Sequence, residues 1–306
     1  MKAKHVIIYL LLVIVTSSCI RDEAPNAEAD ILSCRLPGIT MTTSPIINNN
    51  SVTLFVTPGT NISALAPEFT LTSGATITPA SGTERNFNSP QEYQVTAADG
   101  IWKKTYAISV IDTELATIYN FEDTISGKKY YIFVERENDK VIMEWASGNA
   151  GYAMTGVAKT ADDYPTFQIA NGKNGKCLSL VTRSTGFFGG LVGMPIAAGN
   201  LFIGSFDVNN AMSNPLQATK FGLPFRHVPT YLAGYYKYKA GDQFTEGGKP
   251  VEGKRDICDI YAIMYETSVS VPTLDGTNAF TSPNLVSMAR IKDAKETDEW
   301  TYFKLP

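Results

Sequence analysis

The sequence has little histidine, little charge and no excess of positive charge. Only two histidines occur among the 306 residues, His5 and His227, and His5 lies in a segment that we expect to be cleaved. Histidine-rich zinc sites and Ser-His-Asp catalysis would therefore depend on His227 alone, which nearly excludes both. The formal net charge is −4. Without a basic excess to neutralise phosphates, nucleic acid is excluded as a partner.

Charged residues make up only 18% of the chain, whereas hydrophobic residues reach 44%, enough for a sizeable core. Soluble domains typically carry roughly 25% charged residues. Thr, Ser and Asn replace the charges here, a composition that favours strands and turns over helices. The chain is also longer than an ordinary single domain, so two folded units are expected.

The N-terminus lacks a hydrophobic run long enough to cross a bilayer. Lys2 and Lys4 precede an apolar run at residues 6–15, and small residues follow before Cys19. This order predicts a secretory signal peptide over residues 1–18. It resembles a bacterial lipobox, which implies that Cys19 is lipidated and begins the mature protein. Thr16 stands where leucine is commonest, and an unmodified cysteine after a plain signal peptide is the alternative.

Residues 19–29 read as a flexible tether, because an acidic pair is followed by Ala, Pro and Asn. The acidic pair, Asp22 and Glu23, resembles the surface-export signal on lipoproteins of Gram-negative glycan-foraging bacteria. That resemblance implies a lipid anchor in the outer membrane, with the protein facing the cell exterior.

The cysteines that remain after Cys19 are Cys34, Cys177 and Cys258, and no Cys-x-x-Cys motif is present. An odd number cannot all pair internally. Each lies among apolar strand residues, which favours buried free thiols. A disulfide between Cys177 and Cys258 is the alternative.

Residues 30–112 contain short strand-like runs separated by turn residues. The clearest is an alternating run at 93–97, then Asp99-Gly100, then a second run at 106–110. Alternation on both sides of Asp-Gly predicts a hairpin, and the strand spacing predicts a small β-sandwich. The segment resembles the immunoglobulin- or cadherin-like modules that stand first in such lipoproteins. We expect this N-terminal module to act as a spacer.

Residues 113–306 show almost no helical periodicity. Instead, strand-like runs recur between clusters of Gly and Asn, at 129–135, 141–145, 176–181, 201–208, 232–238, 257–265 and 285–291. Many short strands over this length predict a jelly-roll-like β-sandwich. The predicted chain is therefore all-β, an immunoglobulin-like sandwich followed by a jelly-roll-like C-terminal domain.

Tyrosine-rich strands are the strongest candidates for a binding site. In the run at 256–266, alternation puts Cys258 and Ala262 on a face that we expect in the core. Asp259, Tyr261 and Tyr265 share the opposite face, which combines aromatic surface with a carboxylate. Such a face suits a sugar, because its C–H face stacks on a ring while its hydroxyls need polar partners. Packing of these tyrosines against another sheet is the alternative.

Two further aromatic segments are candidates for glycan binding. Tyr236 and Tyr238 share one face of a strand, and Tyr235 shares the other with lysines. Trp145 ends a strand, and Asn149 lies in a Gly-flanked loop of the kind that often carries binding groups. A core position for Trp145 is the alternative.

Sequence blocks from residue 119 onward resemble a known family. In order they are YNFEDT at 119–124, WASGNAGYAM at 145–154, AAGNLFIGSF at 197–206, KFGLPFRHVPTYLAGYYKYKAGD at 220–242, DICDIYAIMYE at 256–266 and DEWTYFKLP at 298–306. Together they resemble the putative carbohydrate metabolism domain family of surface lipoproteins in glycan-foraging bacteria. The resemblance implies a β-sandwich related to carbohydrate-binding jelly rolls, and partners among polysaccharide-utilisation proteins.

The family pattern and this sequence differ at the C-terminal end. Family members continue past the Trp-x-x-Phe strand into a Ser- and Gly-rich segment and a last strand with an acidic residue. This sequence ends at Pro306. We therefore expect the C-terminal domain to lack its last strands.

Glycan binding is favoured over catalysis, because aromatic surface is abundant and no acid–base constellation is visible. The sugar-binding interpretation and the low charge content together favour a neutral glycan. A glycoside hydrolase with a carboxylate pair formed between strands is an alternative, with Asp259 and Glu266 as candidates. A structural or adhesion subunit is a second alternative. No cofactor is expected, although jelly rolls often hold a structural calcium ion, for which Glu122 or Asp123 are candidate ligands.

Overall fold

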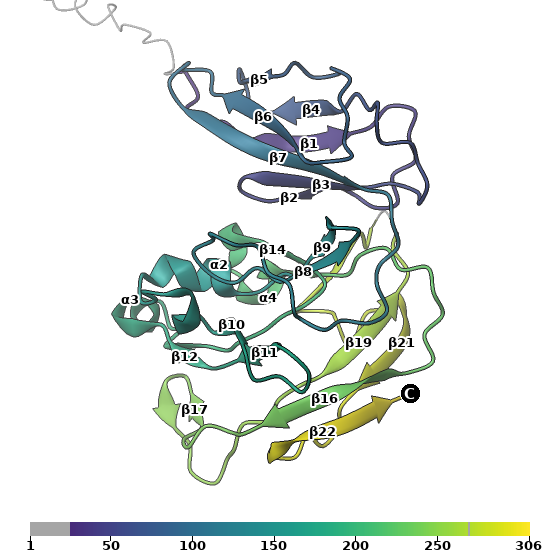
Figure 1. Cartoon of the computed structure of the whole chain (residues 1–306). Coiled ribbons are helices and arrows are strands. Elements are labelled where there is room, and N and C mark those ends of the chain that lie inside the picture. The colour runs from purple at the N-terminus through teal and green to yellow at the C-terminus, as the bar shows by residue number, and fades with distance from the viewer. Residues whose placement is uncertain (1–24, 269) are drawn as a thin grey trace, which may run out of the picture.

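The chain is described by a computed structural model that covers residues 25–268 and 270–306 (Figure 1). The predicted signal peptide and Cys19 lie outside the described residues. Strands dominate and the helices are short, so the prediction of an all-β chain is confirmed. No helix within the described ranges has the length and apolar character needed to span a membrane.

The N-terminal module consists of two facing sheets. Its strands are β1 (Ile31–Arg35), β2 (Ile46–Ile47), β3 (Ser51–Phe55), β4 (Glu68–Leu71), β5 (Thr76–Thr78), β6 (Gln91–Thr96) and β7 (Lys103–Ile111). β1 pairs with β4, and the other sheet has the order β2-β3-β7-β6-β5. β3 and β7 are parallel, whereas the other pairs are antiparallel.

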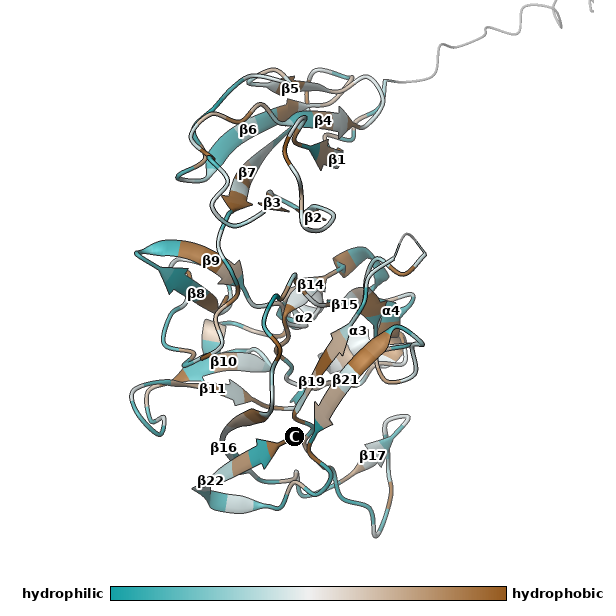
Figure 2. Cartoon of the chain, turned by 90° about the vertical axis from the view of Figure 1, so that its right-hand side faces the viewer, coloured by the Kyte–Doolittle hydropathy of each residue, from teal (hydrophilic) through white to brown (hydrophobic). Residues whose placement is uncertain are grey.

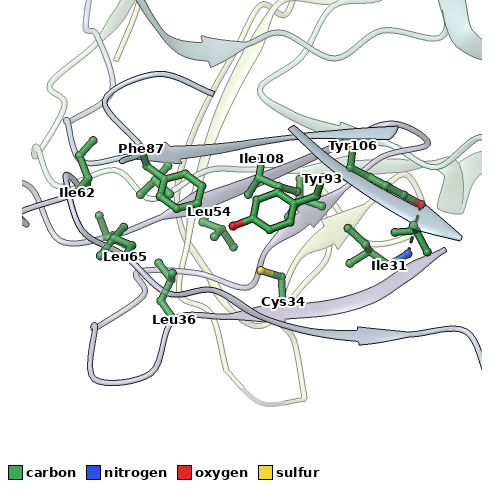
Figure 3. Close-up of a cluster of buried hydrophobic side chains, with 14 of the residues drawn as sticks. Ile31, Cys34, Leu36, Leu54, Ile62, Leu65, Phe87, Tyr93, Tyr106 and Ile108 are labelled. Atoms are coloured by element: carbon green, nitrogen blue, oxygen red, sulfur yellow. Dashed lines mark hydrogen bonds between the residues drawn. The ribbon is translucent and has the colours of Figure 1, made fainter. Parts of the chain in front are cut away.

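The predicted Asp-Gly hairpin is confirmed as β6 and β7. Gly100 takes a φ of 71°, which the turn requires, and Asp99 Oδ1 accepts the backbone N–H of Ile101 at 2.8 Å. The alternating apolar residues of both strands point into one core (Figure 3). There Tyr106 donates its hydroxyl to Asp30 Oδ1 at 2.9 Å and accepts the N–H of Ile31 at 3.3 Å.

The C-terminal domain contains fifteen strands among its described residues, most of them short. They are β8 (Val134–Glu137), β9 (Lys140–Glu144), β10 (Thr166–Ile169), β11 (Cys177–Leu180), β12 (Arg183–Ser184), β13 (Ile196–Ala197), β14 (Gly204–Phe206), β15 (Thr219–Phe221), β16 (Leu232–Tyr238), β17 (Thr245–Glu246), β18 (Lys249–Pro250), β19 (Tyr261–Tyr265), β20 (Leu274–Asp275), β21 (Leu285–Arg290) and β22 (Thr297–Leu305). β14, β15 and β20 form a three-stranded sheet, and the others form antiparallel pairs such as β16–β22 and β19–β21.

Short helices interrupt the strands, although helical periodicity is nearly absent from this part of the sequence. They are α2 (Asn149–Tyr152), α3 (Gly186–Leu191) and α4 (Pro215–Ala218), with 3-10 turns η1 (Ala153–Thr155), η2 (Ala161–Asp163) and η3 (Val208–Asn210). At four to six residues each, the α-helices are too short for an amphipathic pattern to be visible.

A lysine–aspartate ion pair and a histidine–glutamate contact link the segment after β7 to the C-terminal domain. Lys140 Nζ lies 2.7 Å from Asp112 Oδ1, and His227 Nε2 lies 3.1 Å from Glu114 Oε2. Ile111 and Arg226 are among the residues around a cavity of about 20 Å³ at this junction. That volume holds about one water molecule.

Candidate glycan-binding face

The antiparallel pair β16–β22 has one outward face and one inward face. It lies at the end of the C-terminal domain that is farthest from the N-terminal module (Figures 1 and 2). Burial alternates along β16, so that Ala233, Tyr235 and Lys237 are exposed and the residues between them are half-buried. In the register of the pair, Tyr235 is opposite Tyr302 and Ala233 is opposite Lys304. Ala233, Tyr235, Tyr302 and Lys304 therefore share the outward face.

Four aromatic residues on this face form what we call the aromatic platform: Tyr231, Tyr235, Trp300 and Tyr302. Tyr231 is 52% exposed, Tyr235 49% and Tyr302 54%. The rings of Tyr235 and Tyr302 lie side by side, with centroids 5.2 Å apart and planes inclined at 53°. Large aromatic side chains usually bury most of their surface in a core, so adjacent exposed rings make this face a candidate binding surface.

Lysine ammonium groups lie against three of the four rings. Lys304 Nζ is 4.1 Å from the centroid of Tyr231, and Lys173 Nζ is 4.3 Å from that of Tyr235. Lys237 Nζ is 5.5 Å from the centroid of Trp300. Lys237 and Lys304 come from the strands themselves, whereas Lys173 reaches over from the turn between β10 and β11.

The β16 residues that the sequence predicts for glycan binding lie on the face opposite the aromatic platform. Tyr236 and Tyr238, which we expected to contact sugar, belong to the half-buried inward face. Tyr236 packs on Phe303 and donates its hydroxyl to the Lys295 carbonyl at 3.4 Å. Burial raises the pKa of Tyr238 to about 12. Both faces of β16 carry tyrosine, so alternation alone could not decide which one points outward.

The tyrosines of β19 also pack inward, which is the alternative left open by the sequence. Tyr261 packs edge-on against Phe280 with ring centroids 4.9 Å apart, and the Tyr265 hydroxyl donates to the carbonyl of Phe221. Ala262, expected in the core, is exposed. In the register of the pair, Met264 is opposite Ser287, so the exposed residue of β21 that shares the face of Ala262 is Ser287.

The two carboxylates named as catalytic candidates are not brought together. Both oxygens of Asp259 accept hydrogen bonds from the Arg290 guanidinium, at 3.0 and 2.7 Å. Glu266 is exposed seven residues further along. A near-extended chain of that length spans about 23 Å, well beyond the separation that a glycosidase pair needs.

Asn149 is fully buried, so its side chain stabilises the folded domain and has no surface for a ligand. Its Nδ2 donates to the Thr166 carbonyl at 2.7 Å, and its Oδ1 accepts the Thr166 N–H at 3.1 Å. These bonds fasten α2 to the beginning of β10.

Trp145 is half-buried in an aromatic cluster beside a carboxylate that the sequence did not single out. Its ring lies 5.0 Å from that of Tyr119 and 5.4 Å from that of Phe121. Its indole N–H donates to Glu135 Oε1 at 2.8 Å. Burial raises the pKa of Glu135; the indole hydrogen bond opposes this shift and the charge of Asp123 adds to it. The sequence could not predict this hydrogen bond between Glu135 and Trp145, because it depends on how the two segments pair.

Glu122 uses its carboxylate to hold a turn. Its Oε1 accepts the backbone N–H of Lys176 at 3.0 Å, in the same turn that carries Lys173. Asp123 is exposed. Within the described part of the chain, no three His, Cys, Asp or Glu side chains gather as a metal site would require. The calcium ligands expected from the sequence stay a prediction.

Comparison with known protein families identifies the family to which the chain belongs. Residues 120–306 match the family described as putative carbohydrate metabolism domain. The chain belongs to this family. Residues 31–110 match a second family, described as the N-terminal domain of SGBP, the surface glycan-binding proteins. The resemblance inferred from the sequence blocks is thus confirmed, and the protein has a carbohydrate-related function. No curated protein matches the chain.

Two crystal structures of similar proteins come from Bacteroides. One, from Bacteroides thetaiotaomicron VPI-5482, is 86% identical, covers 94% of this chain and 84% of its own, and superposes with a TM-score of 0.89. The other, from Bacteroides vulgatus ATCC 8482, is 48% identical, covers 61% of this chain and 76% of its own, with a TM-score of 0.57. Both are described as putative glycoside hydrolases.

Proposed function

We propose that this member of the putative carbohydrate metabolism domain family binds a glycan on the aromatic platform. The observation that carries the proposal is the adjacent pair Tyr235 and Tyr302, each about half exposed, with ring centroids 5.2 Å apart. Sugar rings present C–H faces that stack on aromatic planes. Tyr231 and Trp300 extend the same face in both directions, which suits a polysaccharide better than a single sugar.

A polysaccharide screen with platform variants tests this proposal. We expect the full chain to be retarded in affinity gels by at least one polysaccharide, and Tyr235→Ala with Tyr302→Ala to abolish the retardation. Trp102→Ala is the matched control, since Trp102 is 63% exposed but lies on the N-terminal module. Retardation that survives loss of both tyrosines would show that the platform is not the binding site.

We further propose that the protein works at the cell surface as a lipoprotein of the outer membrane. The match of residues 31–110 to SGBP supports a surface location, and the lipobox-like sequence before Cys19 supports the anchor. Expression of Cys19→Ala should release the protein from the membrane fraction, while surface proteolysis of intact cells should degrade the unsubstituted protein. Glycan and other polysaccharide-utilisation proteins are the partners that this location favours.

Hydrolysis is a second candidate function, favoured by Glu135. Its half-buried carboxyl and raised pKa are features of a general acid, and the hydrogen bond from Trp145 fixes the position of the carboxyl group. The two crystal structures described as putative glycoside hydrolases give this candidate weight. If it is right, Glu135→Gln should abolish release of reducing sugar, and Glu137→Gln, an exposed change on the same strand, should not. Equal turnover by both variants would exclude Glu135.

A further inference from the structure

We propose that the glycan bound on the aromatic platform is anionic, carrying carboxylate or sulfate groups. The inference rests on the proposed function, because it names the chemical class of ligand for the same face. Its basis is the set of three lysines, Lys173, Lys237 and Lys304, whose ammonium groups lie against platform rings.

These three lysines have no carboxylate partner among the residues that the structure describes. Of the 20 other lysine and arginine side chains that the structure describes, eight form ion pairs with Asp or Glu, namely Arg35, Lys104, Lys140, Lys220, Lys254, Arg255, Arg290 and Lys295. The chain as a whole is acidic, with a net charge of −4. Asp298 and Glu299 are exposed on β22 before Trp300, but the ammonium groups beside Tyr231, Tyr235 and Trp300 form no ion pair with them. Unpaired ammonium groups along one face attract an anion.

The lysines are spread along the length of the platform. Tyr231 and Tyr235 are four residues apart, so the face extends over about 13 Å along the strand direction. Lysines stand near both ends of this length, with Lys304 at Tyr231 and Lys237 two residues beyond Tyr235. A polymer that stacks along the rings would thus meet an ammonium group repeatedly, as a polyanion requires.

A lysine held by an exposed ring is free to change partner. The interaction of an ammonium with an exposed aromatic face is weak, whereas a hydrogen bond to a charged oxygen is stronger. When an anionic sugar arrives, each ammonium gains by moving from the ring to the acid group, and the ring face becomes available for stacking. The low overall charge favoured a neutral glycan, but the local arrangement on the binding face outweighs composition.

The test compares polymers that differ only in charge. We would measure binding of the full chain to polygalacturonate and its methyl ester, and to dextran sulfate and dextran, at low and high ionic strength. The lysine variant combines Lys173→Gln, Lys237→Gln and Lys304→Gln. The control variant removes the same charge elsewhere, with Lys103→Gln, Lys249→Gln and Lys292→Gln, three exposed lysines away from the platform.

We expect at least one anionic polymer to bind about tenfold more tightly than its neutral counterpart, as three partly screened charge contacts allow. High salt and the lysine variant should each remove this preference, and the control variant should retain it. Tyrosine-dependent binding without preference for the anion would overturn the inference and leave the proposed function standing. Anion binding that survives loss of Tyr235 and Tyr302 would overturn both, and binding to none of the four polymers would overturn the inference.

Discussion

Replacing Asn149 by alanine separates a structural role for this residue from the glycan-binding role suggested by its Gly-flanked position. The side chain is fully buried and makes two hydrogen bonds, both to the main chain of Thr166, which is itself 1% exposed. Alanine would leave the Thr166 carbonyl and N–H without partners in a site that water does not reach.

The expected cost follows from those two orphaned groups. A buried donor or acceptor left unsatisfied costs about 1–3 kcal/mol. Because α2 can shift slightly and admit water, we expect Asn149→Ala to lower the free energy of unfolding by about 2–4 kcal/mol. Binding of glycan to the folded variant should be unchanged, since Asn149 has no exposed surface.

Urea unfolding followed by tryptophan fluorescence measures this loss, because Trp145 lies in the short segment between β9 and α2. Asn171→Ala is the matched control: the residue is an exposed asparagine in the turn after β10 and should leave the unfolding midpoint unchanged. An Asn149→Ala variant with an unchanged midpoint and lost glycan binding would refute the argument.

Three further predictions concern strain, titration and reactivity. Gly204→Ala should destabilise the protein by several kcal/mol in the same urea assay. The φ angle of Gly204 is 142°, and an added Cβ would lie 1.9 Å from a backbone oxygen of β15. Gly190→Ala is the control, because a Cβ there would have nothing within 4 Å. The hydrogen bond from Lys104 lowers the pKa of Asp30 below 3.8, against the effect of burial. Charged Asp30 therefore stabilises the folded module above pH 3.8, and this contribution is lost as pH falls through the lowered pKa. In Asp30→Asn, the free energy of unfolding should depend less steeply on pH in the acid range. Cys34, whose pKa burial raises to about 12, should resist alkylation at pH 8 until urea unfolds the module, as timed mass spectrometry would show.

Local patterns predicted the strands well where one face is clearly apolar. β16 was predicted at its observed bounds, and the Asp-Gly hairpin was predicted because a turn with positive φ and two alternating runs agree. Cys34, expected as a buried free thiol, is one, and Cys177 and Cys258 are also unpaired.

The aromatic platform could not be predicted, because it depends on which strands pair. Trp300, Tyr302 and Lys304 alternate along the last strand, and this pattern was the available signal. Its meaning appears only when β22 lies beside β16 and puts Tyr302 next to Tyr235. Both faces of β16 carry tyrosine. Packing of the rest of the C-terminal domain against one face decides which tyrosines are buried, and the sequence of a single strand does not contain that information.

The placement of β7 in its sheet has a mechanical consequence. β7 is the middle strand of five, with β3 parallel on one side and β6 antiparallel on the other, and the chain leaves its end for the C-terminal domain. A pull on the C-terminal domain therefore loads β7 along its own axis. Hydrogen bonds on both sides are then sheared together rather than peeled one at a time, so the module resists extension under such a pull.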